Sequence, residues 1–359
     1  MLRTFKLATL GLLRSSGVFR IVAKSRWRQE RLLILCYHGT SLQDEHEWRP
    51  SLYIHPQKLE ERLISLKRGN FSVLPLGEGL ERLKAGTLPP ASVALTFDDG
   101  TYDFYRQAYP LLRKYGLPAT VYQTTYYTEL ERPVFNLICS YMLWQRRDAT
   151  IADGASVGLP GALDPRTEAS RYAIVRRLIE SSADKTGVEK DEIAARLAQV
   201  LHIDYKALKA SRILQLMNAA ELKEIAANGI DLQLHTHRHR TPEDEQLFRK
   251  EIRDNRAVVR QFTSTDPVHF CYPSGIYREQ FLSWLRKENI VSATTCDAGL
   301  VARESESLLL PRYVDHQRRT QLDFESWTTG VGEFFAMRRQ ASQKAIPNYR
   351  IGADTPSSD

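Results

Sequence analysis

The residues VALTFDDG, from Val93 to Gly100, decide the fold class of this chain. Val93–Phe97 is a continuous run rich in apolar and β-branched residues, as expected for a strand that is covered on both faces in a parallel sheet. Asp98 and Asp99 follow directly, and Gly100 permits a sharp exit from the strand. Because functional groups gather at the carboxyl ends of parallel strands, this stretch predicts an α/β architecture together with a site.

Six further runs of the same kind predict strands, and helical stretches separate most of them. The runs are Leu32–Tyr37, Ala119–Gln123, Ile230–Leu234, Val268–Tyr272, Ser292–Cys296 and Leu308–Leu310. The helical stretches are Gln57–Arg68, Phe104–Tyr115, Ala220–Asn228 and a helix that begins at Thr241 and Pro242. Seven strands alternating with helices indicate an α/β fold, a closed or nearly closed (β/α)7 barrel, with a doubly wound open sheet as the alternative.

The alternation stops over residues 126–220, which contain helical stretches, a polar loop and no clear strand. We expect a helical insertion there, within a barrel that extends over residues 32–340. Residues 341–359 form a polar, proline-containing tail that we expect to be flexible.

The net charge of +7 is concentrated in one short segment. Residues 1–31 hold eight basic side chains and one acid, so the remaining 328 residues are balanced. A nucleic-acid-binding domain needs a basic face on its body, so we expect no nucleic-acid partner. The four cysteines form no CxxC pair and are expected to be reduced, mostly buried thiols, which suits a reducing compartment.

The segment 1–31 has the pattern of a basic amphipathic helix. Its apolar run is short and no convincing small-x-small cleavage site follows, so the sequence argues against a secretory signal. No stretch approaches the roughly 18 apolar residues of a membrane span. Peripheral contact with an anionic membrane and simple packing on the body stay open as alternatives. We expect a cytoplasmic protein.

Three further strand ends carry polar residues beside the Asp98-Asp99 pair. His235-Thr236-His237-Arg238-His239 follows one strand, and two imidazoles four residues apart can meet one ion if the chain turns helically. With Asp99 they form the two-His, one-carboxylate set of a catalytic zinc site. Another strand ends in the turn Tyr272-Pro273-Ser274-Gly275, which could aim a backbone N–H at an oxyanion, and the first strand ends in His38. Read alone, the Asp-Asp-Gly and Pro-Ser-Gly stretches are more often turns.

Together these motifs resemble the polysaccharide deacetylase family, the NodB homology domain of carbohydrate esterase family 4. The motif TFDDG stands as Thr96–Gly100, H-[S/T]-x-x-H as His235–His239, and an aromatic Pro-x-Gly turn as Tyr272–Gly275. The resemblance covers roughly residues 32–125 and 215–315. It implies a distorted barrel of seven strands, Asp98 as the general base, and Asp99, His235 and His239 as metal ligands.

The chain departs from the family pattern at two positions. The usual arginine of the third motif, which supports the catalytic aspartate, is replaced by Cys271. The late Leu-x-His motif that supplies the general acid has only His316 as a counterpart. The pair Tyr37-His38 resembles the start of the biofilm poly-N-acetylglucosamine deacetylase subgroup, where an early histidine replaces the late one, so we favour His38 over His316.

The function predicted on this basis is metal-dependent removal of an acetyl group from an N-acetylated amino sugar in a polysaccharide, glycan or lipid-linked sugar. Zinc suits the ligand set best, with cobalt or nickel as further candidates. Two alternatives stay open. One is another amidohydrolase that uses His235 and His237 as an H-x-H metal pair, and the other is an inactive carbohydrate-binding barrel. The substrate itself is beyond what the sequence specifies.

Overall fold

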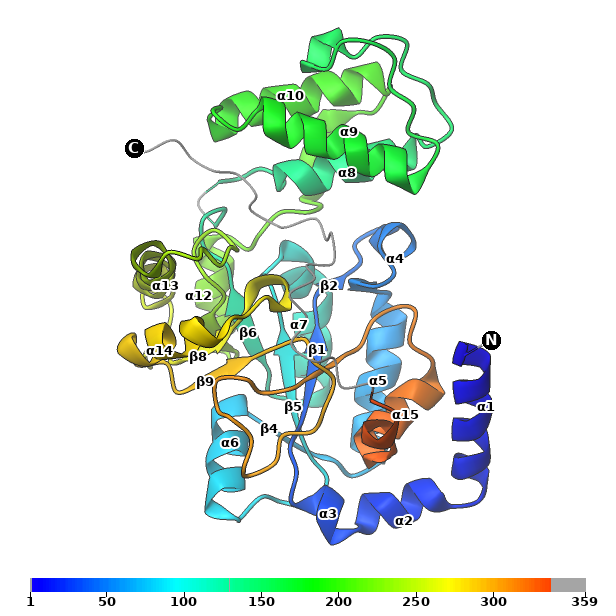
Figure 1. Ribbon diagram of the computed structural model, residues 1–359, viewed down its shortest axis with the longest axis vertical. Helices are drawn as coiled ribbons and strands as arrows, with labels where there is room; N and C mark the ends of the chain where they lie inside the picture. The colour runs from blue at the N-terminus through cyan, green and yellow to red at the C-terminus, as the bar shows by residue number, and fades with distance from the viewer. Residues whose placement is uncertain (1, 129, 337–359) are drawn as a thin grey trace.

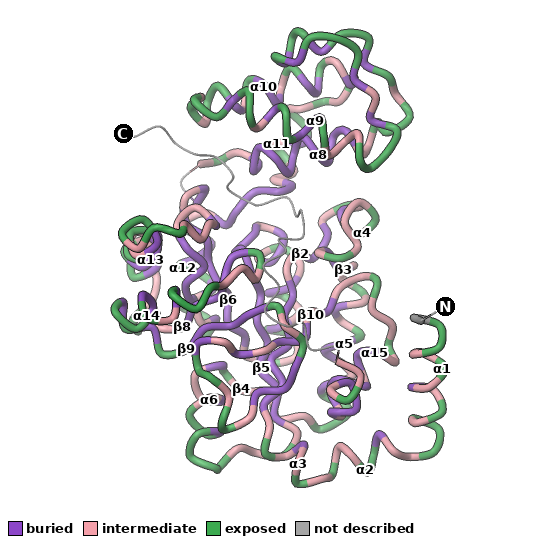
Figure 2. Tube along the Cα trace, in the orientation of Figure 1, coloured by how far each residue is buried: buried purple, intermediate pink, exposed green. Residues whose placement is uncertain are grey.

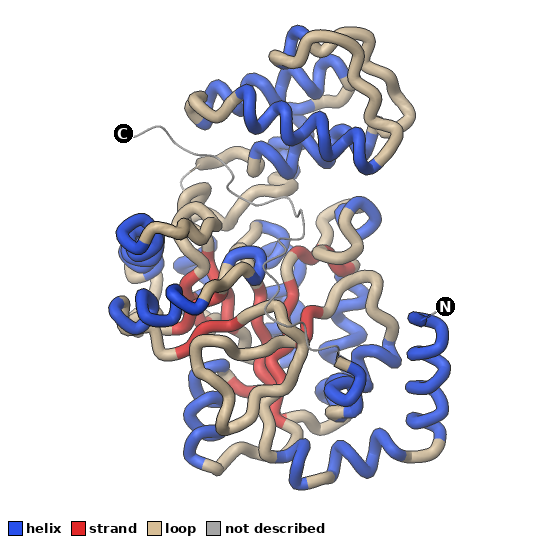
Figure 3. Tube along the Cα trace, in the orientation of Figure 1, coloured by secondary structure: helices blue, strands red, loops and turns tan. Residues whose placement is uncertain are grey.

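The computed structural model describes residues 2–128 and 130–336, and its centre is a curled parallel sheet with helices packed around it (Figures 1 and 3). The order of neighbouring strands is β10-β1-β5-β6-β7-β8-β9, and β4 also pairs with β5. The bounds are β1 Leu33–Tyr37, β4 Ser72–Leu74, β5 Ser92–Phe97, β6 Thr120–Gln123, β7 Asp231–Leu234, β8 His269–Cys271, β9 Ser292–Thr294 and β10 Tyr313–Val314. A separate two-stranded sheet pairs β2 Gly39–Thr40 with β3 Tyr53–Ile54.

The strand order follows the order of the chain, as in a barrel, so the alternative of a doubly wound open sheet was wrong. One segment near the C-terminal end of the described chain bonds to both edges of the sheet. Leu310 bridges to Thr294 in β9, and Tyr313 and Val314 pair with β1. Six of the predicted strands are confirmed, but Leu308–Leu310 is not a strand. Pro311 has no N–H for a ladder, so regular pairing begins only after it.

Four of the helices that surround the sheet were predicted, and three of them begin and end close to the predicted positions. The exception is α13, which starts at Glu245 rather than at Thr241 and Pro242, because the Asp244 side chain accepts a hydrogen bond from the N–H of Leu247. The helices of the barrel are α4 Glu45–Trp48, α5 Pro56–Arg68, α6 Leu76–Ala85, a π-helix Phe104–Ala108 continuing into α7 Tyr109–Tyr115, α12 Ala219–Ala227, α13 Glu245–Val259, α14 Glu279–Lys287 and α15 Gln321–Thr329.

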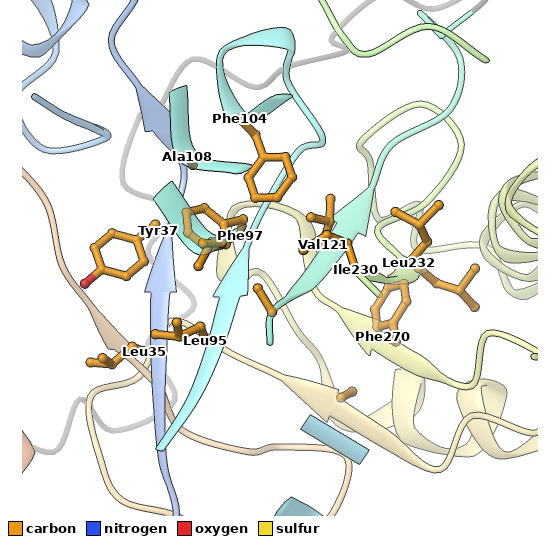
Figure 4. Close-up of a cluster of buried hydrophobic side chains, with 14 of the residues drawn as sticks. Leu35, Tyr37, Leu95, Phe97, Phe104, Ala108, Val121, Ile230, Leu232 and Phe270 are labelled. Atoms are coloured by element: carbon orange, nitrogen blue, oxygen red, sulfur yellow. The ribbon is translucent and has the colours of Figure 1, made fainter. Parts of the chain in front are cut away.

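Alternation along the strands divides the sheet into an outer apolar face and an inner face. Leu35, Tyr37, Leu95 and Phe97 belong to the outer face, where they pack against the helices in one buried cluster (Figure 4). The inner face of the same strands carries a smaller apolar cluster lower in the barrel, formed by Leu32, Ile34, Leu76, Leu83, Ala94, Tyr122, Cys271, Val301 and Leu310. Above this cluster the inner face becomes polar.

Between Tyr126 and the start of α12, the described residues form four α-helices, one short 3-10 helix at Ala155–Val157 and no strand, and they lie beyond one end of the barrel (Figure 3). The helices are α8 Phe135–Gln145, α9 Glu168–Ser181, α10 Gly187–Val200 and α11 Tyr205–Ser211. They share a buried apolar cluster of their own, visible as the buried inner sides of these helices in Figure 2. Strands β6 and β7, which flank this segment in the chain, are neighbours in the sheet.

The N-terminal segment forms α1 Leu2–Ser15, α2 Val18–Lys24 and α3 Arg26–Gln29, which lie along the body beside α15 (Figure 1). Leu10 and Phe19 are buried against Val331. The fully buried guanidinium of Arg28 donates to the carbonyl oxygens of Arg31, Ser92 and Thr328. Of the two alternatives for this segment, packing on the body is therefore observed. None of the described helices combines the length and the apolar character that a bilayer crossing requires. The tail at 341–359 lies outside the described residues.

Candidate active site

The polar end of the inner face is produced by strand parity. Ala94 and Thr96 face inward from β5, so Asp98, two residues further, continues the same face. The register pairs Cys36 of β1 with Thr96, which brings His38 to the level of Asp98. Their closest atoms, Nε2 of His38 and Oδ2 of Asp98, are 3.6 Å apart.

Asp98 forms a buried ion pair with Arg312, a residue that the sequence motifs did not indicate. The guanidinium binds both carboxylate oxygens, with Nη1 2.7 Å from Oδ1 and Nη2 2.8 Å from Oδ2. The thiols of Cys36 and Cys271 each lie 3.5 Å from Oδ2. Arg312 lies 41 residues after Cys271 in the chain. It supports Asp98 as the third-motif arginine does in the family that these motifs resemble.

This environment keeps Asp98 ionised although it is only 2% exposed. Burial alone would raise the pKa of Asp98, but the charge and hydrogen bonds of Arg312, with smaller contributions from His38 and His235, hold that pKa well below its usual range. Burial raises the pKa of the Cys36 and Cys271 thiols, so both are protonated donors toward the carboxylate.

Asp99 leaves the strand direction and turns toward the two histidines. Its φ of 73° is left-handed, and Gly100 continues the turn with the same φ. A Cβ at position 100 would lie 1.9 Å from Oε1 of the buried Gln123, so a larger residue there would strain the turn and displace the Gln123 amide. The result separates the two neighbouring carboxylates, with Asp98 directed to Arg312 and Asp99 to His235 and His239.

His235 and His239 each place Nε2 3.2 Å from the same oxygen, Oδ1 of Asp99. The ligand atoms of these three buried residues lie within 4.8 Å of one another. The expectation of a helical turn between the histidines was wrong. The chain turns instead through left-handed residues, Thr236 with φ 63° and His239 with φ 51°. The threonine hydroxyl accepts a hydrogen bond from the N–H of Arg240, which closes this turn.

The hydrogen bonding of His235 tests whether this group fits a cation. Its Nδ1 lies 2.8 Å from the carbonyl oxygen of Cys271, which can only accept, so Nδ1 carries the hydrogen. In the neutral imidazole, Nε2 then presents a lone pair to the Asp99 carboxylate. A nitrogen lone pair and a carboxylate oxygen 3.2 Å apart can share one cation, and the imidazole–carbonyl contact is the usual way to orient a metal-bound histidine. The residues therefore fit a divalent metal ion.

Helix α13 fixes the loop that carries the histidines. The side-chain oxygen of the fully buried Asn255 accepts from the N–H of His235, while its amide donates to the carbonyl of Gln123 and the hydroxyl of Thr125. The Glu251 carboxylate accepts from the N–H of Arg238 and from the guanidinium of Arg240. Both acceptors come from one face of one helix, which positions the loop without contacting Asp99.

His237 is directed away from this cluster, as the hypothesis of a pair at 235 and 239 requires. Its Nδ1 lies 2.9 Å from the Thr125 hydroxyl, and its ring meets Tyr126 edge-on. The structure thus provides no support for an H-x-H metal pair formed by His235 and His237.

The two candidate general acids differ in their surroundings. His38 is partly exposed and faces Asp98. His316 lies with Nδ1 3.0 Å from the carbonyl of Pro50, and burial, with the charge of Arg319, lowers its pKa to about 4. A histidine with that pKa carries no dissociable extra proton near neutral pH, so His38 is the better placed of the two.

The third motif forms a tight turn directly after β8. Pro273–Gly275 is a short 3-10 turn in which Ser274 is exposed and has a left-handed φ of 58°. Tyr272 does not belong with a substrate-binding group, because its ring lies in the outer apolar cluster and its hydroxyl donates to the carbonyl of Leu308. Strand parity explains this placement, since Cys271 faces inward and its neighbour must face outward.

A curled parallel sheet with helices around it and a polar cluster at its strand ends belongs to the α/β class of (β/α) barrels. The profile described as polysaccharide deacetylase matches residues 85–159 and 200–292 of the chain. Over 67 residues it is 37% identical to the poly-beta-1,6-N-acetyl-D-glucosamine N-deacetylase of Staphylococcus aureus, which covers 19% of this chain and 23% of that protein. The curated relatives are matched over only 23–31% of their own length.

Two solved structures have the same fold. The Streptococcus pyogenes deacetylase PplD, in complex with acetate, gives a TM-score of 0.55 at 18% identity, over 83% of this chain and 98% of that one. IcaB from Ammonifex degensii gives a TM-score of 0.51 at 16% identity, over 83% and 97%. These structures confirm the predicted barrel, and the profile match confirms the predicted resemblance to the polysaccharide deacetylase family.

Proposed function

We propose that this protein is a metal-dependent N-deacetylase that hydrolyses the acetamido group of an N-acetylated amino sugar in a glycan. The observation that carries the proposal is the convergence of Asp99, His235 and His239 on one point beside the ionised Asp98. One oxygen of Asp98 and one ring nitrogen of His235 lie within 4.8 Å of each other, so the carboxylate proposed as the base lies next to the proposed metal ligands.

In this proposal Asp99, His235 and His239 hold the ion, with zinc as the best match to two nitrogens and one oxygen. When bound, the ion supplies Lewis-acid polarisation of the acetyl carbonyl and a lower pKa for a water molecule. The remaining chemistry belongs to the chain. Asp98 accepts a proton from the water that attacks the acetyl carbon, and the backbone near Ser274 in the turn 273–275 faces the oxyanion.

The test of the function is acetate release by the full-length protein, loaded in turn with zinc, cobalt and nickel, from a set of N-acetylated glycans that includes lipid-linked sugars. Release from at least one glycan, and its loss on chelation, is the expected result. Glycan binding without release under any of the three metals would instead favour the inactive carbohydrate-binding barrel.

We expect His38→Ala to lower kcat by roughly 100- to 10,000-fold, the usual contribution of a general acid, because the departing amine then lacks a proton donor. His316→Ala serves as the matched control and should change kcat by less than about threefold, since His316 is neutral near pH 7. The measurement is kcat on the best glycan between pH 6 and 9. A larger loss in His316→Ala than in His38→Ala would exchange the roles of the two residues.

For the N-terminal segment we propose contact with an anionic membrane surface in addition to its packing on the body. Phe5, Leu12 and Ile21 are 75%, 71% and 70% exposed, and Arg20 and Lys24 on α2 are exposed as well. Apolar side chains among basic ones are the pattern of a helix that lies in a lipid interface. The cytoplasmic location stays a prediction.

Replacing Phe5, Leu12 and Ile21 together by serine should release the protein from vesicles containing anionic phosphatidylglycerol, measured by co-sedimentation. The triple variant keeps Leu10, Phe19 and Arg28 and therefore the packing of the segment. The control replaces three exposed apolar residues elsewhere, Val188, Leu247 and Val291, by serine. Equal sedimentation of the wild-type protein and the triple variant would contradict the membrane proposal.

A further inference from the structure

A pocket adjoins the loop that carries the histidines, on the side of the helical insertion. It has a volume of about 260 Å³ and is enclosed between the end of β6, α8, α10 and α11. Sites for drug-sized ligands measure roughly 300–1,000 Å³, so this pocket accommodates one sugar unit or one small charged group.

The pocket shares a wall with the deacetylation site. The N–H of Tyr126 donates to the carbonyl of His237 at 2.8 Å, and the guanidinium of Arg238 lies over the Tyr126 ring. Both Tyr126 and Arg238 line the pocket. Arg238 directly precedes His239, so the pocket and the metal-ligand cluster are built on the same loop. A glycan bound in both places is part of the proposal below.

The lining combines aromatic rings with an excess of positive charge. Tyr126, Tyr127, Phe135 and Tyr205 supply rings that can pack against sugar faces. The basic residues in the lining are Arg132, Lys185, Lys190 and Arg238. Among the described residues of the lining, Asp191 is the one acid, and it is already bound by the Tyr205 hydroxyl at 2.5 Å and by Lys209 at 2.8 Å.

Two of the cations are unengaged by protein carboxylates. Within the described ranges, neither Arg132 nor Lys185 has a carboxylate at ion-pair distance, whereas Arg238 pairs with Glu251. Arg132 reaches across to the start of α10, where a Cβ at Gly187 would lie 3.2 Å from its Nη1. The two unpaired cations thus come from the two sides of the pocket, where an anionic group can bind both by charge-assisted hydrogen bonds.

We propose that this pocket binds an anionic substituent, a phosphate or a carboxylate, on a sugar of the same glycan that is deacetylated. The inference rests on the proposed function for the identity of the ligand as an acetylated glycan. It adds that the substrate is charged, which the family motifs do not specify, and it assigns the recognition of that charge to Arg132 and Lys185 of the helical insertion.

The test compares three matched N-acetylglucosamine oligomers: one neutral, one with a terminal phosphate and one that ends in a uronic acid. Calorimetric titration of the full-length protein stripped of metal measures binding without turnover. At least one charged oligomer should bind about tenfold more tightly than the neutral one, and the difference should shrink as salt is added. The charged oligomer that binds more tightly identifies the anionic group.

The double variant Arg132→Gln, Lys185→Gln should abolish this preference while the neutral oligomer binds as before. Lys206→Gln is the matched control, since Lys206 is an exposed cation on α11 outside the lining. Equal dissociation constants for neutral and charged oligomers in the wild-type protein, or an unchanged preference in the double variant, would overturn the inference. Acetate release from the same oligomers by the metal-loaded enzyme is scored separately, so failure of the proposed function is distinguishable from failure of the pocket.

Discussion

Replacing Arg312 by glutamine is expected to destabilise the protein by about 3–5 kcal/mol and to move the acid limb of kcat/KM to higher pH. Without Arg312, the largest remaining influence on Asp98 is burial, which raises the pKa of its carboxyl. A general base works only when ionised, so activity that the wild type retains at mildly acidic pH is lost in the variant. The measurements are denaturant unfolding and a pH profile of kcat/KM.

The sign of the stability effect also depends on pH. In the wild type, the depressed pKa of Asp98 stabilises the fold above pH 4 or so, and this stabilisation is lost as pH falls. In Arg312→Gln the folded-state pKa is raised, so the variant should be least stable at high pH, where the stranded carboxylate must be ionised.

Two further substitutions separate the effect of the Arg312 charge and its geometry from the effect of its packing volume. Adding Asp98→Asn to Arg312→Gln removes the stranded charge, so the free energy of unfolding should recover in part while activity does not. Arg312→Lys keeps a charge but loses the two-pronged geometry, and should retain more activity than Arg312→Gln. An acid limb that stays in place in Arg312→Gln would show that Arg312 acts only as packing.

His235→Ala should abolish stoichiometric metal binding and lower kcat/KM by about a thousandfold or more. Losing the ion removes several kcal/mol of transition-state stabilisation, and each 1.36 kcal/mol corresponds to a factor of ten in rate. The measurements are metal content of the purified, zinc-equilibrated protein and acetate release. Full metal content together with full activity in this variant would contradict the assignment of the site.

His237→Ala is the internal control for that experiment, because the same loop loses an imidazole that faces Thr125 and Tyr126 instead of Asp99. It should retain its metal, whereas His239→Ala should lose it. The reverse result would favour the H-x-H amidohydrolase alternative.

Much of the site could be predicted because strand parity is a local property. Once Val93–Phe97 is a strand, Asp98 must follow Thr96 on one face, and the parallel register places His38 beside it. Gly100 indicates a turn at this point, and the turn directs the Asp99 side chain toward His235 and His239 instead of Arg312. One local error, the expected helical turn between His235 and His239, arose because left-handed residues other than glycine leave little trace in a sequence.

Arg312 could not be assigned from motifs, because its partner Asp98 is more than 200 residues away and meets it only when the barrel closes. A signal was nevertheless present, since Arg312 is a cation inside the apolar segment 308–314 and has the same parity as the inward-facing Leu310. Asn255 gave a similar signal, as a polar residue on the apolar stripe of α13 that includes Phe248, Ile252 and Val259. Polar residues at positions that continue an apolar pattern were the informative exceptions.

The position of Arg312 in the closing segment has a consequence for how the enzyme is completed during synthesis. Domains generally fold as units during synthesis, and Asp98 is made long before Arg312. A nascent chain that has reached residue 292 already contains every residue matched by the family profile, yet it lacks the countercharge for its base. The segment 310–314 therefore both closes the ring of strands and brings Arg312 to the buried carboxylate of Asp98. A product truncated before this segment contains the motifs but lacks the countercharge of Asp98.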